Sequence, residues 1–150
     1  MFLQHYGHIA QRCKGNRGNL WIVKPGENSN QGSGITVCQT LGEIKSRLRG
    51  RERNKDGSLR TFIVQKYIER PMLYRGRKFD LRHFLLLTCT NGILKAYWFP
   101  EGYLRTASSH YSLRTPADQM VHLTNDAIQR RGGDYGKHEK GNKVSYGDFA

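Results

Sequence analysis

The sequence has few cysteines, and their placement excludes several kinds of site. Only three occur among 150 residues, Cys13, Cys38 and Cys89, and no two have the spacing of a CxxC pair. This argues against a zinc site and a thioredoxin-type redox motif, and it favours a reducing compartment. Cys38 and Cys89 lie in apolar, strand-like runs, so we expect both as buried thiols. The histidines are scattered without metal-ligand spacing.

Long apolar stretches are also missing. The longest run, residues 84–87, is far too short to cross a bilayer. The first residues lack the charged-then-apolar order of a secretory signal. We therefore expect a cytoplasmic protein with no membrane partner. The chain has no internal repeat or low-complexity tract, and its length suits one domain with a real core.

Acidic residues are scarce. The chain has 12 aspartates and glutamates against 25 lysines and arginines, which gives a formal charge of +13. This charge favours an acidic partner such as nucleic acid, an anionic membrane or an acidic protein surface. A basic cluster is either a solvated loop or a docking surface. It consists of Lys45, Arg47, Arg49, Arg51, Arg53, Lys55 and Arg60.

The first half of the chain predicts a hairpin followed by a helix. Short strands at residues 20–23 and 35–38 flank a turn-rich loop and are expected to pair. Thr40 and Glu43 have the spacing of a capping box, so a helix should start there, and Gly50 can close it. Apolar residues at helical spacing support that helix; they are Leu41, Ile44 and Leu48.

The second half of the chain predicts more strands. Asn91-Gly92 between two apolar runs is the strongest short hairpin signal. Antiparallel strands with a few helices give an α+β fold class. Trp21 and Trp98 lie in strands and are expected in the core. The predicted elements of this half are strands at residues 61–65, 78–90 and 93–99, and a helix capped by Thr124 or Asn125 that reaches about Arg130.

Three ionisable residues alternate along the predicted strand at residues 78–90. Lys78, Asp80 and Arg82 are two apart, so their side chains share one face. Burying a cation, an anion and a cation together requires mutual pairing or a charged ligand. A nucleotide offers a ribose for the carboxylate and phosphates for the cations. The alternative is a surface ladder in which Asp80 neutralises its neighbours and adds little stability.

A lysine also precedes a glycine-containing loop. Lys24 ends a predicted strand, and Gly32 and Gly34 follow. Glycines let backbone N–H groups approach phosphate oxygens, and the lysine adds a point charge. The residue order excludes a Walker loop and a protein-kinase loop. The alternative is an ordinary hairpin loop.

Six motifs in this order resemble the tubulin–tyrosine ligase family from about Leu20 to the end of the chain. They are Leu20-Trp21-Ile22-Val23-Lys24-Pro25, Gly32-Ser33-Gly34-Ile35, Val64-Gln65-Lys66-Tyr67-Ile68-Glu69-Arg70-Pro71, Lys78-Phe79-Asp80-Leu81-Arg82, Glu101-Gly102-Tyr103-Leu104-Arg105-Thr106 and His122-Leu123-Thr124-Asn125. The resemblance implies a partial ATP-grasp fold. Residues 20–64 would form the lid and central subdomain and residues 65–150 the start of the C-terminal subdomain, after a disordered or truncated segment at residues 1–19.

The resemblance also implies an activity. Such enzymes use ATP and Mg²⁺ to join a free amino acid (Tyr, Glu or Gly) to a protein carboxylate, most often on the acidic C-terminal tail of tubulin, through an acyl phosphate. The resemblance further implies that the protein is a monomer and that it acts at the cytoskeleton, the cilium or the basal body. The resemblance implies that Lys24 binds the ATP phosphates, with Gly32 and Gly34 in a mobile lid, and that Gln65, Lys66, Tyr67 and Ile68 line the adenine pocket. Lys78 and Asp80 would contact the nucleotide, and Arg82 would face the transferring phosphate. Arg105 would bind the carboxylate of the amino acid, and Thr124 and Asn125 would close the site around ATP.

The chain departs from the family pattern in two ways. Gln31 stands where an arginine is usual beside the glycine turn. The family's magnesium ligands, an Asp and a later Glu-x-Asn block, are expected outside this chain, so it is interpreted as a fragment of a ligase. A catalytically inactive nucleotide- or tubulin-binding module is the alternative. A basic nucleic-acid-binding domain, supported by residues 51–60 and by the aromatic residues 97–99, lacks any nucleic-acid motif, so no nucleic acid partner is expected.

Overall fold

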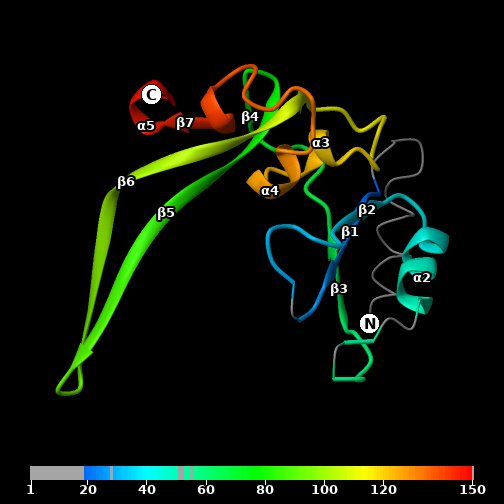
Figure 1. Cartoon of the computed structure of the whole chain (residues 1–150), viewed down its shortest axis with the longest axis horizontal. Helices are drawn as coiled ribbons and strands as arrows, with labels where there is room; N and C mark the ends of the chain where they lie inside the picture. The colour runs from blue at the N-terminus through cyan, green and yellow to red at the C-terminus, as the bar shows by residue number, and fades with distance from the viewer. Residues whose placement is uncertain (1–18, 28, 51–52, 55, 150) are drawn as a thin grey trace.

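The computed structural model describes residues 19–27, 29–50, 53–54 and 56–149, which form two antiparallel sheets with short helices (Figure 1). This confirms the predicted α+β class and agrees with a partial ATP-grasp architecture. The expectations for residues 1–18, including Cys13, lie outside the described residues. So do Arg51 and Lys55 of the basic cluster.

The first sheet contains the predicted hairpin. Its strands are β1 (Trp21–Pro25), β2 (Thr36–Cys38) and β3 (Phe62–Lys66), in the order β2-β1-β3. Trp21 pairs with Cys38 on one side and with Lys66 on the other. Helix α2 (Leu41–Arg49) packs Ile44 onto Trp21, Val23 and Cys38, which form a small core.

The start of α2 confirms the predicted cap by Thr40, while the reciprocal bond of Glu43 goes to the residue before the cap. The Thr40 hydroxyl accepts a hydrogen bond from Glu43 N at 3.2 Å, and the Glu43 carboxylate accepts one from Gln39 N at 2.9 Å. The helix ends at Gly50, which keeps a right-handed backbone (φ −58°). Ile44 is the buried residue of α2, whereas Leu48 is exposed, so the predicted apolar stripe is narrower than its spacing indicated.

The second sheet is dominated by one long hairpin. Its strands are β4 (Leu73–Tyr74), β5 (Arg77–Thr90), β6 (Ile93–His110) and β7 (Lys143–Ser145), in that order. Asn91 and Gly92 connect β5 to β6 with φ values of 53° and 76°, as the Asn-Gly signal predicted. The prediction that this strand stops near Phe99 was wrong. Pro100 lies at a register shift between β5 and β6, and at such an irregularity a missing N–H does not end the strand.

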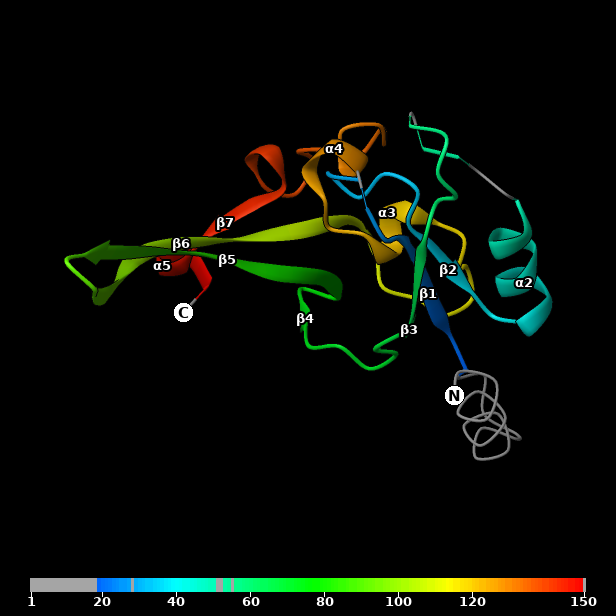
Figure 2. The same cartoon turned by 90° about the horizontal axis from the view of Figure 1, so that it is seen from below.

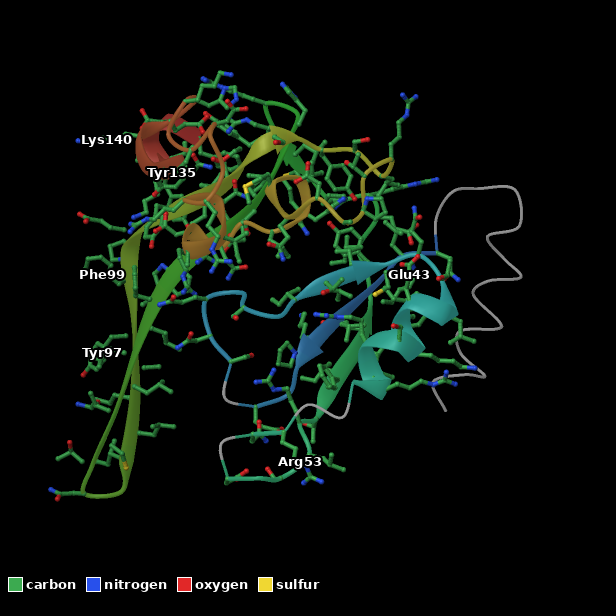
Figure 3. The ribbon with its side chains drawn as sticks, turned by 45° about the vertical axis from the view of Figure 1, so that its right-hand side comes forward. Glu43, Arg53, Tyr97, Phe99, Tyr135 and Lys140 are labelled. Atoms are coloured by element: carbon green, nitrogen blue, oxygen red, sulfur yellow. The ribbon has the colours of Figure 1, made fainter. Side chains whose placement is uncertain are left out.

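The distal half of that hairpin projects from the body of the molecule as an arm, residues 84–99 (Figure 1). Tyr97 and Phe99 extend away from it (Figure 3), and Trp98 is 59% exposed. The predictions that Trp98 lies in the core and that Cys89 is buried were therefore wrong, because in the described part of the chain nothing covers the arm. Trp21 and Cys38 are buried as predicted, and burial raises the pKa of the Cys38 thiol.

The last third of the chain packs short elements against β6 (Figure 2). The helix predicted after Thr124 or Asn125 is present as a single turn that Asn125 precedes. Buried amides fasten two of these elements to β6: Gln129 Oε1, at the end of the turn, accepts from Ser108 N at 2.8 Å, and Asn142 Nδ2, later in the chain, donates to Thr106 O at 3.0 Å. The elements are α3 (Gln119–His122), α4 (Asp126–Gln129), the 3-10 helix η1 (Lys140–Asn142) and α5 (Tyr146–Phe149). None of the helices described here is long and apolar enough to cross a membrane.

Candidate functional site

Two lysines from different sheets lie near enough for the charge of one to act on the other. Lys24 lies on β1 and Lys78 on β5. Burial lowers the pKa of Lys78, the positive charge of Lys24 lowers it further, and Asp80 acts in the opposite direction. Lys24 Nζ also donates to Gln65 Oε1 at 2.7 Å. The two ammonium groups are thus close enough to repel each other, an arrangement that an anion between them would stabilise.

Asp80 is paired across the sheet with Arg105. The two residues are directly opposite on β5 and β6. Arg105 Nε donates to Oδ1 at 3.1 Å, and Nη2 donates to Oδ2 at 2.6 Å. Both side chains are partly exposed, at 34% for Asp80 and 18% for Arg105. Asp80 therefore neutralises a residue of the neighbouring strand and makes no ion pair with Lys78 or Arg82.

Arg82 differs from its neighbours on β5. It is exposed, and within the described residues its side chain makes no hydrogen bond or ion pair. It precedes the register shift that begins after its pairing with Tyr103. The structure therefore leaves the guanidinium of Arg82 available to an anion from outside.

The segment predicted to contact adenine has mixed exposure. Lys66 Nζ donates to Leu20 O at 2.9 Å and also pairs with Glu69. The Tyr67 side chain is turned into the core and is only 5% exposed. Ile68 is 70% exposed and presents an apolar side chain to the outside. Of the side chains of residues 65–68, that of Ile68 is the one best placed to pack on an aromatic ring.

The glycine loop meets the segment that follows α3. Gly32 has φ +83°, and a Cβ there would lie 2.8 Å from Asn125 Cγ. Gly34 has φ +74°, and its Cβ would lie 2.8 Å from Pro25 Cγ. The structure therefore brings Gly32 and Asn125 together. For Thr124 it gives a partly exposed position before α4.

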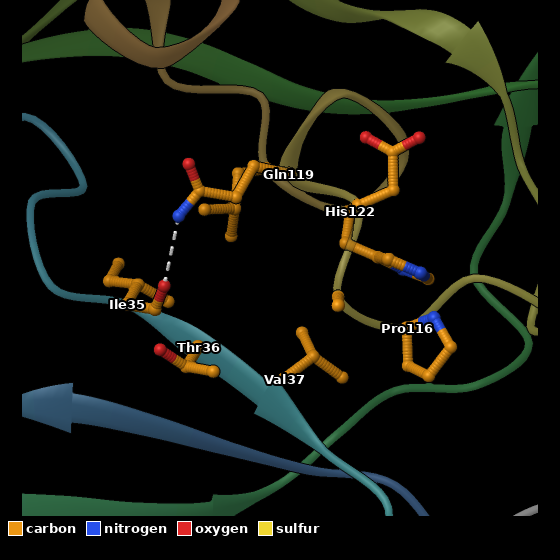
Figure 4. A pocket seen from close by; sticks show the side chains of 9 residues that line it. Ile35, Thr36, Val37, Pro116, Gln119 and His122 are labelled. Carbon is orange, nitrogen blue, oxygen red and sulfur yellow. Dashed lines mark hydrogen bonds between the residues drawn. The ribbon is translucent and has the colours of Figure 1, made fainter. Parts of the chain in front are cut away.

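A small pocket lies between residues 35–37 and residues 116–123 (Figure 4). Gln119 Nε2 spans it and donates to Ile35 O at 3.3 Å. The volume of the pocket, about 30 Å³, suits a water molecule and is far too small for a nucleotide. The charged residues around Lys78 therefore remain the better candidate site.

Two buried polar groupings escaped the sequence analysis. Arg77 is 1% exposed, and its guanidinium donates to Glu139 Oε2 at 2.9 Å and to Ala107 O at 3.2 Å. Tyr67 Oη lies 2.9 Å from Nδ1 of His122, which is also 1% exposed. Each partner lies far away in the sequence. The sequence signal that could have indicated them is weak: a charged or polar residue stands next to an apolar run.

The residues present fit the phosphates of ATP but not a magnesium ion. Lys24 and Lys78 supply cations, and the positive φ values at Gly32 and Gly34 allow backbone N–H groups to approach an anion closely. In the described ranges no three His, Cys, Asp or Glu side chains gather into a metal site, and Asp80 is bound by Arg105. We therefore derive no step through Mg²⁺ from these residues.

Comparison of the sequence with known proteins identifies its relatives. The model of the Tubulin-tyrosine ligase family matches residues 1–150. The chain is 38% identical over 120 residues to Tubulin glycylase 3B of Drosophila melanogaster (80% of this chain, 15% of that protein). It is 39% identical over 121 residues to Tubulin glycylase 3D of Tetrahymena thermophila (81% and 11%) and 42% identical over 113 residues to Tubulin monoglycylase TTLL3 of Homo sapiens (75% and 14%). The match thus spans a small part of each relative.

Proposed function

Since the chain belongs to the tubulin-tyrosine ligase family, a family of ligases, we propose that it carries the nucleotide-binding part of an enzyme that joins an amino acid to a carboxylate of tubulin. The observation that supports this best is the convergence of Lys24 and Lys78 beside the Asp80–Arg105 pair. Fixed cations of this kind stabilise a phosphoryl group whose oxygens gain charge during transfer.

The proposed reaction uses ATP and has two steps. An oxygen of the tubulin carboxylate attacks the γ-phosphorus, the bond to ADP breaks, and an acyl phosphate forms. The amine of the amino acid then attacks the acyl carbon, phosphate leaves with the bonding electrons, and the nitrogen loses a proton. In our proposal Lys24, Lys78 and Arg82 offset the phosphate charge, and Mg²⁺ is held by residues other than those described here.

We propose glycine as the amino acid, because the relatives reported above are named as glycylases. Glycine has no side chain, so its carboxylate is the main group by which a site can orient it. The planar guanidinium of Arg105 is suited to bind a carboxylate through two hydrogen bonds. Asp80 occupies that fork in the structure, so the incoming carboxylate would have to share or replace it.

The substrate protein follows from charge. The net charge of +13 would attract the acidic tail of tubulin, more strongly at low salt. Action on microtubules, including those of cilia, is the corresponding location. No nucleic acid partner is proposed.

The test is an incorporation assay with the natural polypeptide, ATP, Mg²⁺, tubulin and labelled glycine, tyrosine or glutamate in turn. We expect glycine to be incorporated, and Lys24→Ala or Asp80→Ala to weaken ATP binding substantially. Lys95→Ala, an exposed lysine on the arm, is the matched control and should change neither. Incorporation of another amino acid would overturn the choice of glycine. Binding of ATP and tubulin without incorporation of any amino acid would favour an inactive binding module.

A further inference from the structure

A chain of hydrogen bonds runs from Lys78 through Tyr67 to His122. Lys78 Nζ donates to Tyr67 Oη at 3.0 Å, and Tyr67 Oη lies 2.9 Å from His122 Nδ1. His122 Nε2 lies 3.1 Å from the carbonyl oxygen of Thr115. Tyr67 follows β3, Lys78 lies on β5 and His122 ends α3, so the chain links both sheets to that helix.

The final acceptor fixes where the protons lie. The Thr115 carbonyl can only accept, so His122 Nε2 must carry a hydrogen. In the neutral imidazole Nδ1 is then an acceptor, and Tyr67 donates its O–H to it. The lone pairs of Tyr67 Oη therefore remain for Lys78. Each donor in the chain has one acceptor, and no roles conflict.

This arrangement determines the position of the Lys78 ammonium group. A second N–H of Lys78 donates to His122 O at 3.0 Å, and Nζ lies 4.5 Å from the centre of the Tyr67 ring. Two of its three donors and one face of the group are thus occupied by Tyr67 and His122. Its third donor makes no hydrogen bond within the described residues, and Lys24 is near enough for its charge to lower the pKa of Lys78.

We propose that His122 is a positioning residue that, through the Tyr67 hydroxyl, holds the Lys78 ammonium group in place to bind a nucleotide phosphate. The inference rests on the proposed function, because that function supplies the nucleotide. It also changes the role of Tyr67, whose buried side chain accepts a hydrogen bond from Lys78 and does not line the adenine site.

Protonation of His122 would disrupt the chain. Nδ1 would become a donor, so both it and Lys78 would donate to Tyr67 Oη. The Tyr67 O–H would then have to turn from His122 to the neighbouring hydroxyl of Tyr111, which itself donates to Glu69 O at 2.9 Å. The imidazolium would also repel Lys78. Nucleotide affinity should therefore fall at acidic pH.

The surroundings of His122 set where this loss occurs. Burial lowers the pKa of His122 and the Lys78 charge lowers it further, while the bond to Thr115 and the charge of Asp118 at the start of α3 raise it. The ring of Tyr111 lies 5.7 Å away, and burial raises the pKa of its hydroxyl, so it stays neutral over this pH range. Affinity should hold at neutral pH and decline below the ordinary imidazole value of about 6.5.

The experiment measures binding of an ATP analogue with a methylene bridge between the β- and γ-phosphates, from about pH 8 to about pH 5.5. Asn can accept from Tyr67 as Nδ1 does but cannot titrate, so His122→Asn should keep wild-type affinity at neutral pH within about threefold and lose the acidic decline. His122→Leu and Tyr67→Phe should each lower affinity about tenfold, the effect of one lost hydrogen bond. His110→Asn, an exposed histidine at the end of β6, is the control and should keep the wild-type profile.

Nitrogen NMR of the His122 ring gives a second readout in case a variant fails to fold. We expect the Nε2–H tautomer at neutral pH, and an Nδ1 shift that changes in Tyr67→Phe. Unchanged affinity in His122→Leu, an acidic decline that persists in His122→Asn, or the other tautomer would each overturn this inference alone. A wild type that binds no nucleotide at any pH would overturn the proposed function together with it.

Discussion

Asp80 lies directly opposite Arg105, and its carboxylate accepts hydrogen bonds from both Nε and Nη2 of that guanidinium. Since both side chains are partly exposed, the pair should contribute no more than about 1 kcal/mol to folding. Its larger effect is geometric, because two bonds fix the plane in which Arg105 presents its remaining donors. The pair thus orients a group of the candidate site more than it stabilises the fold.

The first prediction separates these two effects. Asp80→Asn and Arg105→Lys should each change the free energy of unfolding by at most about 1 kcal/mol while lowering labelled glycine incorporation at least about tenfold. Urea unfolding and the incorporation assay measure the two quantities. Asp134→Asn, which breaks an exposed ion pair with Lys137 outside the site, is the control and should affect neither. Incorporation at the control's level in both site variants would refute the assigned role.

The second prediction concerns the buried pair of Arg77 and Glu139. Their side chains are 2% and 11% exposed. Glu139→Gln removes the charge that compensates Arg77 and should lower the free energy of unfolding by about 3 kcal/mol. Replacing both residues together, Arg77 by Met and Glu139 by Leu, should recover much of that loss because no buried charge remains. A double variant as unstable as Glu139→Gln would show that packing, and not charge, dominates there.

The same pair predicts a dependence on pH. Burial tends to raise the pKa of Glu139, but hydrogen bonds from Arg77 and Thr106, followed by the charges of Arg77 and His138, hold it below its ordinary value. Such a carboxyl stabilises the fold above its unfolded pKa of about 4.3, and this stability is lost as the pH falls below that value. Urea unfolding of wild type and Glu139→Gln between neutral and acidic pH should therefore show the difference between them shrinking on the acidic side. A constant difference would contradict the prediction.

The sequence predicted those features that depend on neighbours along the chain. The capping box at Thr40 and Glu43 and the Asn91-Gly92 turn are set by backbone geometry within a few residues. The shared face expected for Lys78, Asp80 and Arg82 rests on the same kind of rule, the alternation of a strand, and stays a prediction. These local rules also gave the α+β class, since strand and helix patterns can be counted without knowing how they pack.

The partners of the site residues could not be predicted in the same way. Along the chain the cations nearest to Asp80 are Lys78 and Arg82, two residues away on either side, but the sheet register places Arg105 opposite it. That register depends on the irregularity around Pro100, which the sequence analysis interpreted as the end of a strand. The buried contact of Tyr67 with His122 likewise depends on how the two sheets are joined.

The third prediction tests the contact between the glycine loop and Asn125. Gly32→Ala should disturb the loop because φ is +83° and the new Cβ would lie 2.8 Å from Asn125 Cγ. Gly57→Ala is a close control, since its φ is +84° but nothing lies within 4 Å of the new Cβ. Both should lose about 1 kcal/mol from backbone strain, and only Gly32→Ala should also lower affinity for the ATP analogue. Equal affinities for the two variants would show that the contact does not matter for the ligand.

The apolar arm leads to the last prediction. Residues Phe84, Leu85, Leu86, Tyr97, Trp98 and Phe99 border an open groove of about 380 Å³, and each is at least half exposed. In the described residues β7 pairs with residues 103–105 and β4 with residues 77–78, so along the arm both outer strand edges are also unpaired. Exposed apolar faces and open edges promote association between chains.

We therefore expect the 150-residue chain to self-associate as its concentration rises, which sedimentation velocity can measure. Leu85 and Trp98 are cross-strand neighbours, and replacing both with Thr should shift the chain toward monomer while keeping strand propensity. The free energy of unfolding should change by less than about 1 kcal/mol, because more than half of each side chain is already exposed to water. Leu59→Thr, a leucine of similar exposure away from the arm, should leave association unchanged. A wild-type chain that stays monomeric at every concentration would show that the arm is too polar at its edges, or too mobile, to pair with another copy.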